Sequence, residues 1–156
     1  MNVQTLLDQA AQCKTDSDAQ DLCLAMQEAF TESGPLSHLP VYNADFDMED
    51  AGPYVQFELN RVISEHYITA IKPEIRDGKF AIVVRTSHMK DGLGMQSQNY
   101  EIVNGFDDEV IEGEPEQTIE ELAQRAKELA LKDHRLLIER VGVPEAAAQE
   151  AALASW

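Results

Sequence analysis

The chain has 156 residues, 29 of them acidic and 12 basic, so its formal net charge at pH 7 is -17. A surface of this charge repels nucleic acid and anionic membranes and attracts basic proteins, so we expect no direct nucleic-acid or membrane partner. The hydrophobic fraction of 44% is too high for a disordered chain and sufficient to build a core.

The cysteines and the start of the chain indicate the cellular compartment. Cys13 and Cys23 are too few for the disulfide framework of a small secreted domain. The first residues show no signal peptide, and no stretch approaches the roughly 20 apolar residues that span a bilayer. We therefore expect a cytoplasmic protein.

Two helices are predicted at the start of the chain. Apolar residues with helical spacing predict a first helix over 3–12 and a second from about 16 to 32. The short polar residues Asp16-Ser17-Asp18 suit a helix start, and Ser33-Gly34-Pro35 suits a helix end. The short connection between the two helices favours a helical hairpin.

Residues 34–53 contain three prolines and two glycines, a composition that predicts a long loop. The loop includes an acidic run over 45–50 whose first residues are spaced like those of an EF-hand calcium loop. Such a loop requires glycine at its sixth position and glutamate at its twelfth, where this chain has Asp50 and Gln56. We therefore expect a hydrated anionic loop and no metal site.

The middle of the chain is rich in β-forming residues. Alternation of apolar and polar side chains predicts four strands, over 54–60, 67–75, 80–86 and 100–103. Asp77-Gly78 predicts a tight hairpin turn between the second and third of these strands, and a loop is predicted over 87–98. Residues 61–66 fit either a strand or a helix, and both interpretations stay open.

A second acidic segment, from Asp107 to Glu116, contains one glycine and one proline and is predicted to be a loop. Thr118 and Glu121 have the spacing of a capping box, so a helix is predicted to begin there. We expect helix to continue to about residue 142, with a break near Asp133.

Together these elements predict an α+β fold. It would have an N-terminal helical hairpin, a central antiparallel sheet of three or four strands, and C-terminal helices packed on the sheet. Residues 1–143 are expected to form a single acidic domain, and 144–156 an alanine-rich tail that is either helical or frayed. Association into a homo-oligomer stays open.

The sequence carries no catalytic or cofactor signature. It has no Gly-x-Ser-x-Gly nucleophile turn and no phosphate-binding glycine loop. Its four histidines are not paired at ligand spacing, and His134, between Asp133 and Arg135, is expected on a helix surface. We therefore expect a protein that is not an enzyme and that holds no metal or cofactor.

The acidic residues are concentrated in two blocks. Residues 1–50 hold ten acids and one base, and residues 105–121 hold eight acids and no base, whereas the rest of the chain is balanced. Acids at helix starts favour the helix dipole, which leaves the segments 45–50 and 107–116 without a structural reason for their density. We expect these two segments to lie on the same side of the sheet.

These features favour a non-enzymatic inhibitor that presents an anionic, nucleic-acid-mimicking surface to a basic protein, for example a nucleic-acid-binding enzyme. In composition, though not in sequence, the chain is similar to the acidic inhibitors that phages and mobile elements encode. The residues predicted to contact the partner are Asp45, Asp47, Glu49, Asp50, Asp107, Asp108, Glu109, Glu112, Glu114 and Glu116.

An alternative is an acidic chaperone or adaptor that binds a client protein through exposed apolar residues. The apolar residues that could make that contact are Phe46 and Met48, within the first acidic segment, and Met89, Met95 and Trp156 in a predicted loop and the tail. Salt separates the two hypotheses, because electrostatic contact weakens steeply at high ionic strength and apolar contact does not.

Overall fold

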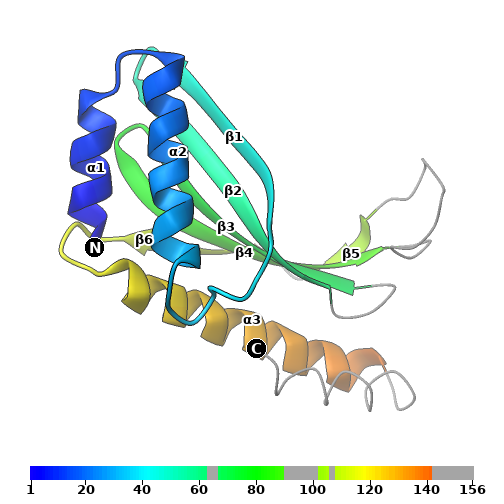
Figure 1. Cartoon of the computed structure of the whole chain (residues 1–156). Coiled ribbons are helices and arrows are strands. Elements are labelled where there is room, and N and C mark those ends of the chain that lie inside the picture. Colours follow the sequence, from blue (N-terminus) through cyan, green and yellow to red (C-terminus); the bar gives the residue numbers. More distant parts are fainter. Residues whose placement is uncertain (63–66, 90–101, 106–107, 142–156) are drawn as a thin grey trace.

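The computed structural model describes residues 1–62, 67–89, 102–105 and 108–141 (Figure 1). Two N-terminal helices are followed by the strands of one sheet and then by a long helix. The elements are α1 (Val3–Gln12), α2 (Asp16–Thr31), β1 (Val41–Glu49), β2 (Gly52–Val62), β3 (Tyr67–Arg76), β4 (Lys79–Met89), β5 (Ile102–Gly105), β6 (Glu109–Gly113) and α3 (Ile119–Val141). The predicted α+β class, with its helical hairpin, antiparallel sheet and C-terminal helix, is confirmed.

Capping residues fix where the helices begin. Thr15 Oγ1 accepts a hydrogen bond from the Asp18 N–H, and the Asp18 carboxylate accepts one from the Thr15 N–H, each at 3.1 Å. The predicted box at α3 is confirmed, because Thr118 Oγ1 accepts from the Glu121 N–H at 3.0 Å and Glu121 accepts from the Thr118 N–H at 3.3 Å. These reciprocal bonds satisfy backbone donors that a helix start otherwise leaves unpaired.

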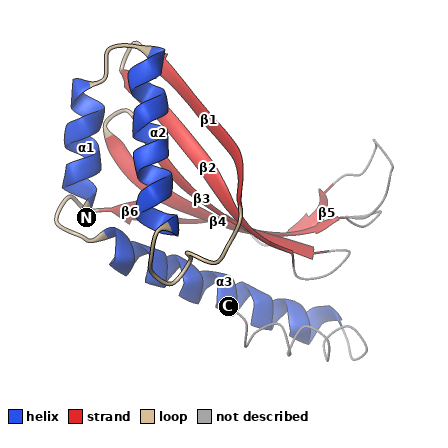
Figure 2. Cartoon of the chain, in the orientation of Figure 1, coloured by secondary structure: helices blue, strands red, loops and turns tan. Residues whose placement is uncertain are grey.

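The sheet has six antiparallel strands, more than the three or four predicted. Strands β1 to β4 follow in chain order, and β5 and β6 both pair with β4 (Figure 2). The predicted hairpin between β3 and β4 is confirmed, with Arg76 opposite Lys79. Its turn residues Asp77 and Gly78 have φ values of 54° and 71°, a conformation that asparagine, aspartate and glycine tolerate best.

The core lies between one face of the sheet and the helices. In Figure 1, α1 and α2 stand in front of the sheet and α3 runs below them. The Phe30 ring from α2 packs against Phe57 of β2, with centroids 5.9 Å apart, and against Phe80 of β4 at 6.3 Å. Alternate residues of the strands point to the opposite face, which no described helix covers and where Lys72 pairs with Glu58 at 3.4 Å.

The predicted loop over 34–53 is wrong, because β1 occupies 41–49 and β2 begins at Gly52. Strand β1 lies at an edge of the sheet, so its side chains stay exposed and the acidic run is tolerated in a strand. A register shift between Tyr42 and Asp45, with Asn43 at φ 51°, interrupts the alternation that would mark the strand in the sequence.

Three further predictions, for later parts of the chain, differ from the structure. The second acidic segment is not wholly a loop, since β6 occupies Glu109–Gly113 beside β4. Helix α3 runs without the expected break, and β4 continues to Met89 in place of the predicted loop start. Strand β2 reaches Val62, whereas 63–66 and the tail over 144–156 lie outside the described residues.

Candidate functional site

Helix α2 and strand β1, the two elements that carry most acids of the N-terminal block, lie side by side (Figure 1). The Asp16 carboxylate at the start of α2 accepts a hydrogen bond from the Met48 N–H of β1 at 3.0 Å. Farther along, the Cys23 thiol lies 3.8 Å from the Asp45 carbonyl oxygen. We call this region the α2/β1 flank. Its exposed acids are Asp16, Asp21, Glu28, Glu32, Asp45, Asp47, Glu49 and Asp50.

The acids of the α2/β1 flank have few cationic neighbours. Within the described part of the chain, the ion pair that they make is Glu49 to Arg76, at 3.6 Å. The Arg76 guanidinium also lies over the Tyr54 ring, 4.0 Å from its centroid, and so stays on the open face of the sheet. The remaining carboxylates face solvent, so the flank keeps its negative charge.

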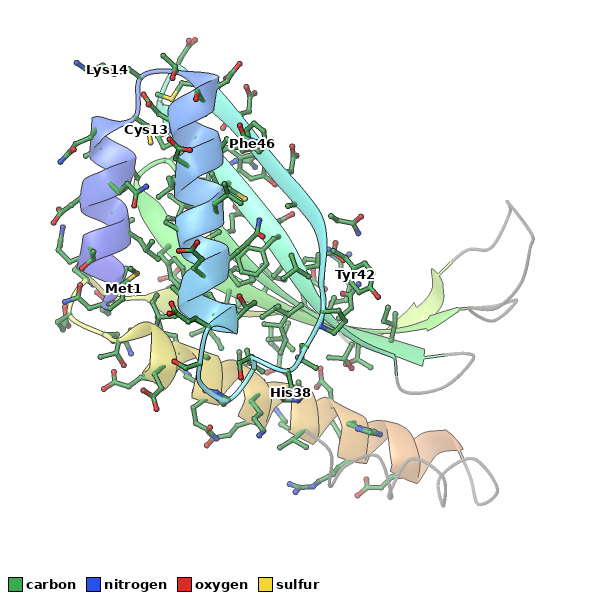
Figure 3. All side chains as sticks on the ribbon, viewed as in Figure 1. Met1, Cys13, Lys14, His38, Tyr42 and Phe46 are labelled. Carbon is green, nitrogen blue, oxygen red and sulfur yellow. The ribbon has the colours of Figure 1, made fainter. Side chains whose placement is uncertain are left out.

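Apolar side chains are exposed among these acids. Leu24 on α2 is 49% exposed, and Tyr42 and Phe46 on β1 are 48% and 37% exposed. Figure 3 shows Tyr42 and Phe46 on β1, apart from one another along the strand. Met48, the second apolar residue predicted to contact a client, is only partly exposed. The flank therefore combines charge with exposed aromatic side chains, and aromatic residues are enriched in protein interfaces.

The second acidic segment is different, because the fold supplies partners for its acids. Asp108 accepts two hydrogen bonds from the Arg85 guanidinium, at 2.7 and 2.6 Å. These bonds lower the pKa of Asp108 below its usual value and raise that of Arg85. Glu109 pairs with Lys132 of α3 at 3.7 Å, so part of this segment's charge is neutralised.

The rest of the second segment stays exposed. Glu112 is on β6, and Glu114 and Glu116 follow it before α3 begins. Asp107 lies outside the described residues. The predicted contact residues therefore divide into an unpaired set on β1 and a set near β6 that is partly paired.

The two acidic segments share a face of the sheet but not an edge. Asp45 lies opposite Gln56 and Glu112 lies opposite Ala81, and these side chains point to the open face. Strands β2, β3 and β4 separate β1 from β6. At about 4.8 Å per strand the two segments are roughly 20 Å apart, so each forms a surface of its own.

A buried polar group under α3 was not predicted from the sequence. Asp133 and His134 are 1% and 0% exposed, so the expectation that His134 lies on a helix surface is wrong. Thr86 Oγ1 lies 3.5 Å from Asp133 Oδ2 and 2.8 Å from Thr69 Oγ1. Burial, and then the nearby Glu109, raise the pKa of Asp133 to about 6.

The helical spacing could have revealed these two buried residues. Ala126 and Ala130 lie on the buried face of α3, and positions three and four residues beyond Ala130 fall on that same face. The expectation that His134 is exposed rested on its neighbours Asp133 and Arg135, of which Arg135 is exposed and Asp133 is buried. A continuous helix therefore carries charge on one side and buries Asp133 and His134 on the other.

The described residues offer little for covalent or metal chemistry. No group of three or more His, Cys, Asp or Glu side chains among them could hold a metal ion. Burial raises the pKa of both thiols, Cys13 and Cys23, which disfavours the reactive thiolate. In this part of the chain, no helix combines the length and apolar character needed to cross a membrane. Comparisons with known protein families, with curated proteins and with solved structures gave no match.

Proposed function

We propose that the chain is a non-enzymatic protein that binds a basic partner through the α2/β1 flank. The observation that carries the proposal is the density of exposed acids on two neighbouring elements, with Asp45 and Asp47 on the open face of the edge strand β1 and others on α2, which packs on the opposite face. Exposed carboxylates without cationic neighbours keep their field, which steers a basic partner toward them and accelerates association. The exposed Tyr42 on the open face of β1, together with Phe46 on its helix-facing side and Leu24 on α2, would then supply apolar contact beside these acids.

The nature of the basic partner follows from the spacing of the acids. Asp45, Asp47 and Glu49 alternate along β1, so neighbouring carboxylates are roughly 6.8 Å apart along the strand. That distance is about twice the 3.4 Å rise between phosphates on one DNA strand. We therefore propose a partner whose basic surface ordinarily binds nucleic acid, and inhibition of that partner as the outcome, as with the acidic inhibitors of phages.

A pair of matched variants tests the location of the surface. The flank variant Asp21→Asn, Asp45→Asn, Asp47→Asn removes three charges that make no ion pair with another described residue. The control variant Glu112→Gln, Glu114→Gln, Glu116→Gln removes three charges near β6. We expect the flank variant to lose at least about tenfold in partner affinity and the control to change little.

The measurement uses the full-length chain as bait. Proteins that the wild type retains and the flank variant loses are identified by quantitative mass spectrometry, and the affinity of the leading one is measured with purified protein. Circular dichroism shows whether each variant stays folded. Equal loss in both variants would contradict the flank as the binding surface, and equal retention would contradict an electrostatic function.

The chaperone or adaptor function remains a second proposal because Phe46 is exposed on the helix-facing side of β1, opposite Val55. A client held by this ring would bind independently of salt, and Phe46→Ser would release it. For the electrostatic partner we expect the affinity to fall steeply between about 50 and 300 mM salt. Affinity that is unchanged over this range would favour the client-binding function.

A further inference from the structure

A layer of polar side chains is buried where α3 crosses the sheet. Asp133, on the described α3, is 1% exposed, and Thr69 and Thr86 on β3 and β4 are 0% and 1% exposed. The two threonine hydroxyls share a hydrogen bond of 2.8 Å, and Thr86 Oγ1 lies 3.5 Å from the Asp133 carboxyl. Glu109 of β6 lies opposite Val84, two residues before Thr86 on the same face of β4, and pairs with Lys132, the neighbour of Asp133 in α3.

The groups around Asp133 give it little compensating charge. Glu109 is itself a second carboxyl group. Its ion-pair partner is Lys132, whose side chain is 62% exposed. The side chains that β3 and β4 contribute here, Thr69 and Thr86, are neutral.

Two further charged or titratable residues lie close to this layer. Arg85 of β4 points to the open face, where it holds Asp108 at 2.6 Å. His134, the next residue of α3, is buried as well.

Ionising both Asp133 and Glu109 at this buried site costs free energy. Burial penalises the charged form, and the like charge of Glu109 penalises it further. A proton held between the two carboxyls removes both penalties, since the protonated Asp133 then donates a hydrogen bond to Glu109.

We propose that a proton shared by Asp133 and Glu109 locks α3 onto β4 and β6, and that loss of this proton as the pH rises loosens the helix around residues 129–137. This device does not depend on the proposed partner-binding function. It is a proton-controlled attachment of the C-terminal helix that responds to pH between about 4 and 6.

The direction of the effect follows from proton linkage. The folded protein holds the Asp133 proton up to about pH 6, whereas an opened helix would release it at the ordinary value of 3.8. The closed state is therefore favoured fully below the lower value, and the advantage disappears as the pH rises through the upper one. Two pKa units correspond to a change of roughly 100-fold in the opening equilibrium.

Amide hydrogen exchange measures that opening. We expect residues 129–137 to open roughly 100-fold more at about pH 8 than at about pH 4, after correction for the intrinsic exchange rate. Helix α2, which has no buried carboxyl, serves as the internal reference. Asp133→Asn cannot ionise, so its opening should be independent of pH. Glu112 lies on the same strand as Glu109 but is exposed, so Glu112→Gln should behave like the wild type.

A second measurement, made on the wild type, tests the proposal even if a variant does not fold. Carbon NMR of the Asp133 carboxyl in the wild type should show a midpoint near 6, and Glu109→Gln should lower it. The proposal is overturned if Asp133 titrates near 3.8 in the wild type. It is equally overturned if α3 opens with the same pH dependence in a folded Asp133→Asn variant.

Discussion

The two acidic segments look alike in the sequence and differ in the structure. On β1, Asp45 and Asp47 face solvent at an edge of the sheet and make no ion pair among the described residues. Near β6, Asp108 is held by two hydrogen bonds from Arg85, and Glu109 is paired with Lys132. A run of acids therefore becomes surface charge only where the neighbouring elements supply no cation.

The difference also separates structural acids from candidate binding acids. An acid that holds a strand or a helix in place is satisfied within the protein and has less to offer a partner. An acid with no internal partner raises the repulsion within the folded state and contributes nothing local to stability. The unpaired acids of the α2/β1 flank are therefore the ones that need an explanation outside the chain.

The largest expected effect comes from a substitution that displaces β6, the strand that carries part of the second acidic segment. A methyl group at Gly113 would lie 2.5 Å from Phe80 Cδ1 and 3.1 Å from Leu122 Cδ1. The Phe80 ring is 2% exposed and stacked on Phe30, so it has little room to move. We expect Gly113→Ala to lower the free energy of unfolding by about 3 kcal/mol in chemical denaturation. A change within about 0.5 kcal/mol would show that β6 is not packed as described.

The next largest effect concerns the second acidic segment, where Glu109 faces the buried Asp133 of α3. Because burial and Glu109 raise the pKa of Asp133 to about 6, its ionisation destabilises the folded state at higher pH. We expect Asp133→Asn to raise the free energy of unfolding by about 2 kcal/mol at about pH 8 relative to wild type. The gain should disappear below about pH 4, and urea titrations at both pH values measure it.

The smallest effect compares one carboxyl from each segment directly. Asp108→Asn removes the charge that holds Arg85, so we expect a loss of about 1 kcal/mol of stability. Asp45→Asn removes a charge that makes no ion pair within the described part of the chain, so we expect a change near zero or a small gain. Equal losses in the two variants, measured by thermal unfolding, would contradict the distinction between paired and unpaired acids.

Local signals in the sequence predicted much of the fold. The capping spacing of Thr118 and Glu121, the turn residues Asp77 and Gly78, and the helical apolar stripes each depend on a few neighbouring residues. Strand β1 was missed because the prolines, glycines and dense acids of 34–53 favoured a loop, and because the bulge after Tyr42 leaves only a short alternation to mark the strand. Such a strand is specified by its neighbour β2 more than by its own composition.

The candidate site was predictable only in part. The acids themselves are evident in the sequence, but their partners are distant, since Arg85 lies 23 residues from Asp108. Nothing local indicates that α2, with its exposed Asp21 and Glu28, would lie beside β1. The burial of His134 was hidden by its charged neighbours. Long-range packing decides which charges remain free, and a composition count cannot supply it.

The most direct test of the anionic flank is an NMR titration of the labelled full-length chain with a short peptide rich in lysine and arginine. We predict amide shift changes concentrated in α2 and β1, which disappear at about 0.3 M salt because the Debye length shortens. Equal changes in β6 and at the start of α3, or changes confined to those elements, would contradict the claim that the unpaired acids of α2 and β1 form the binding surface.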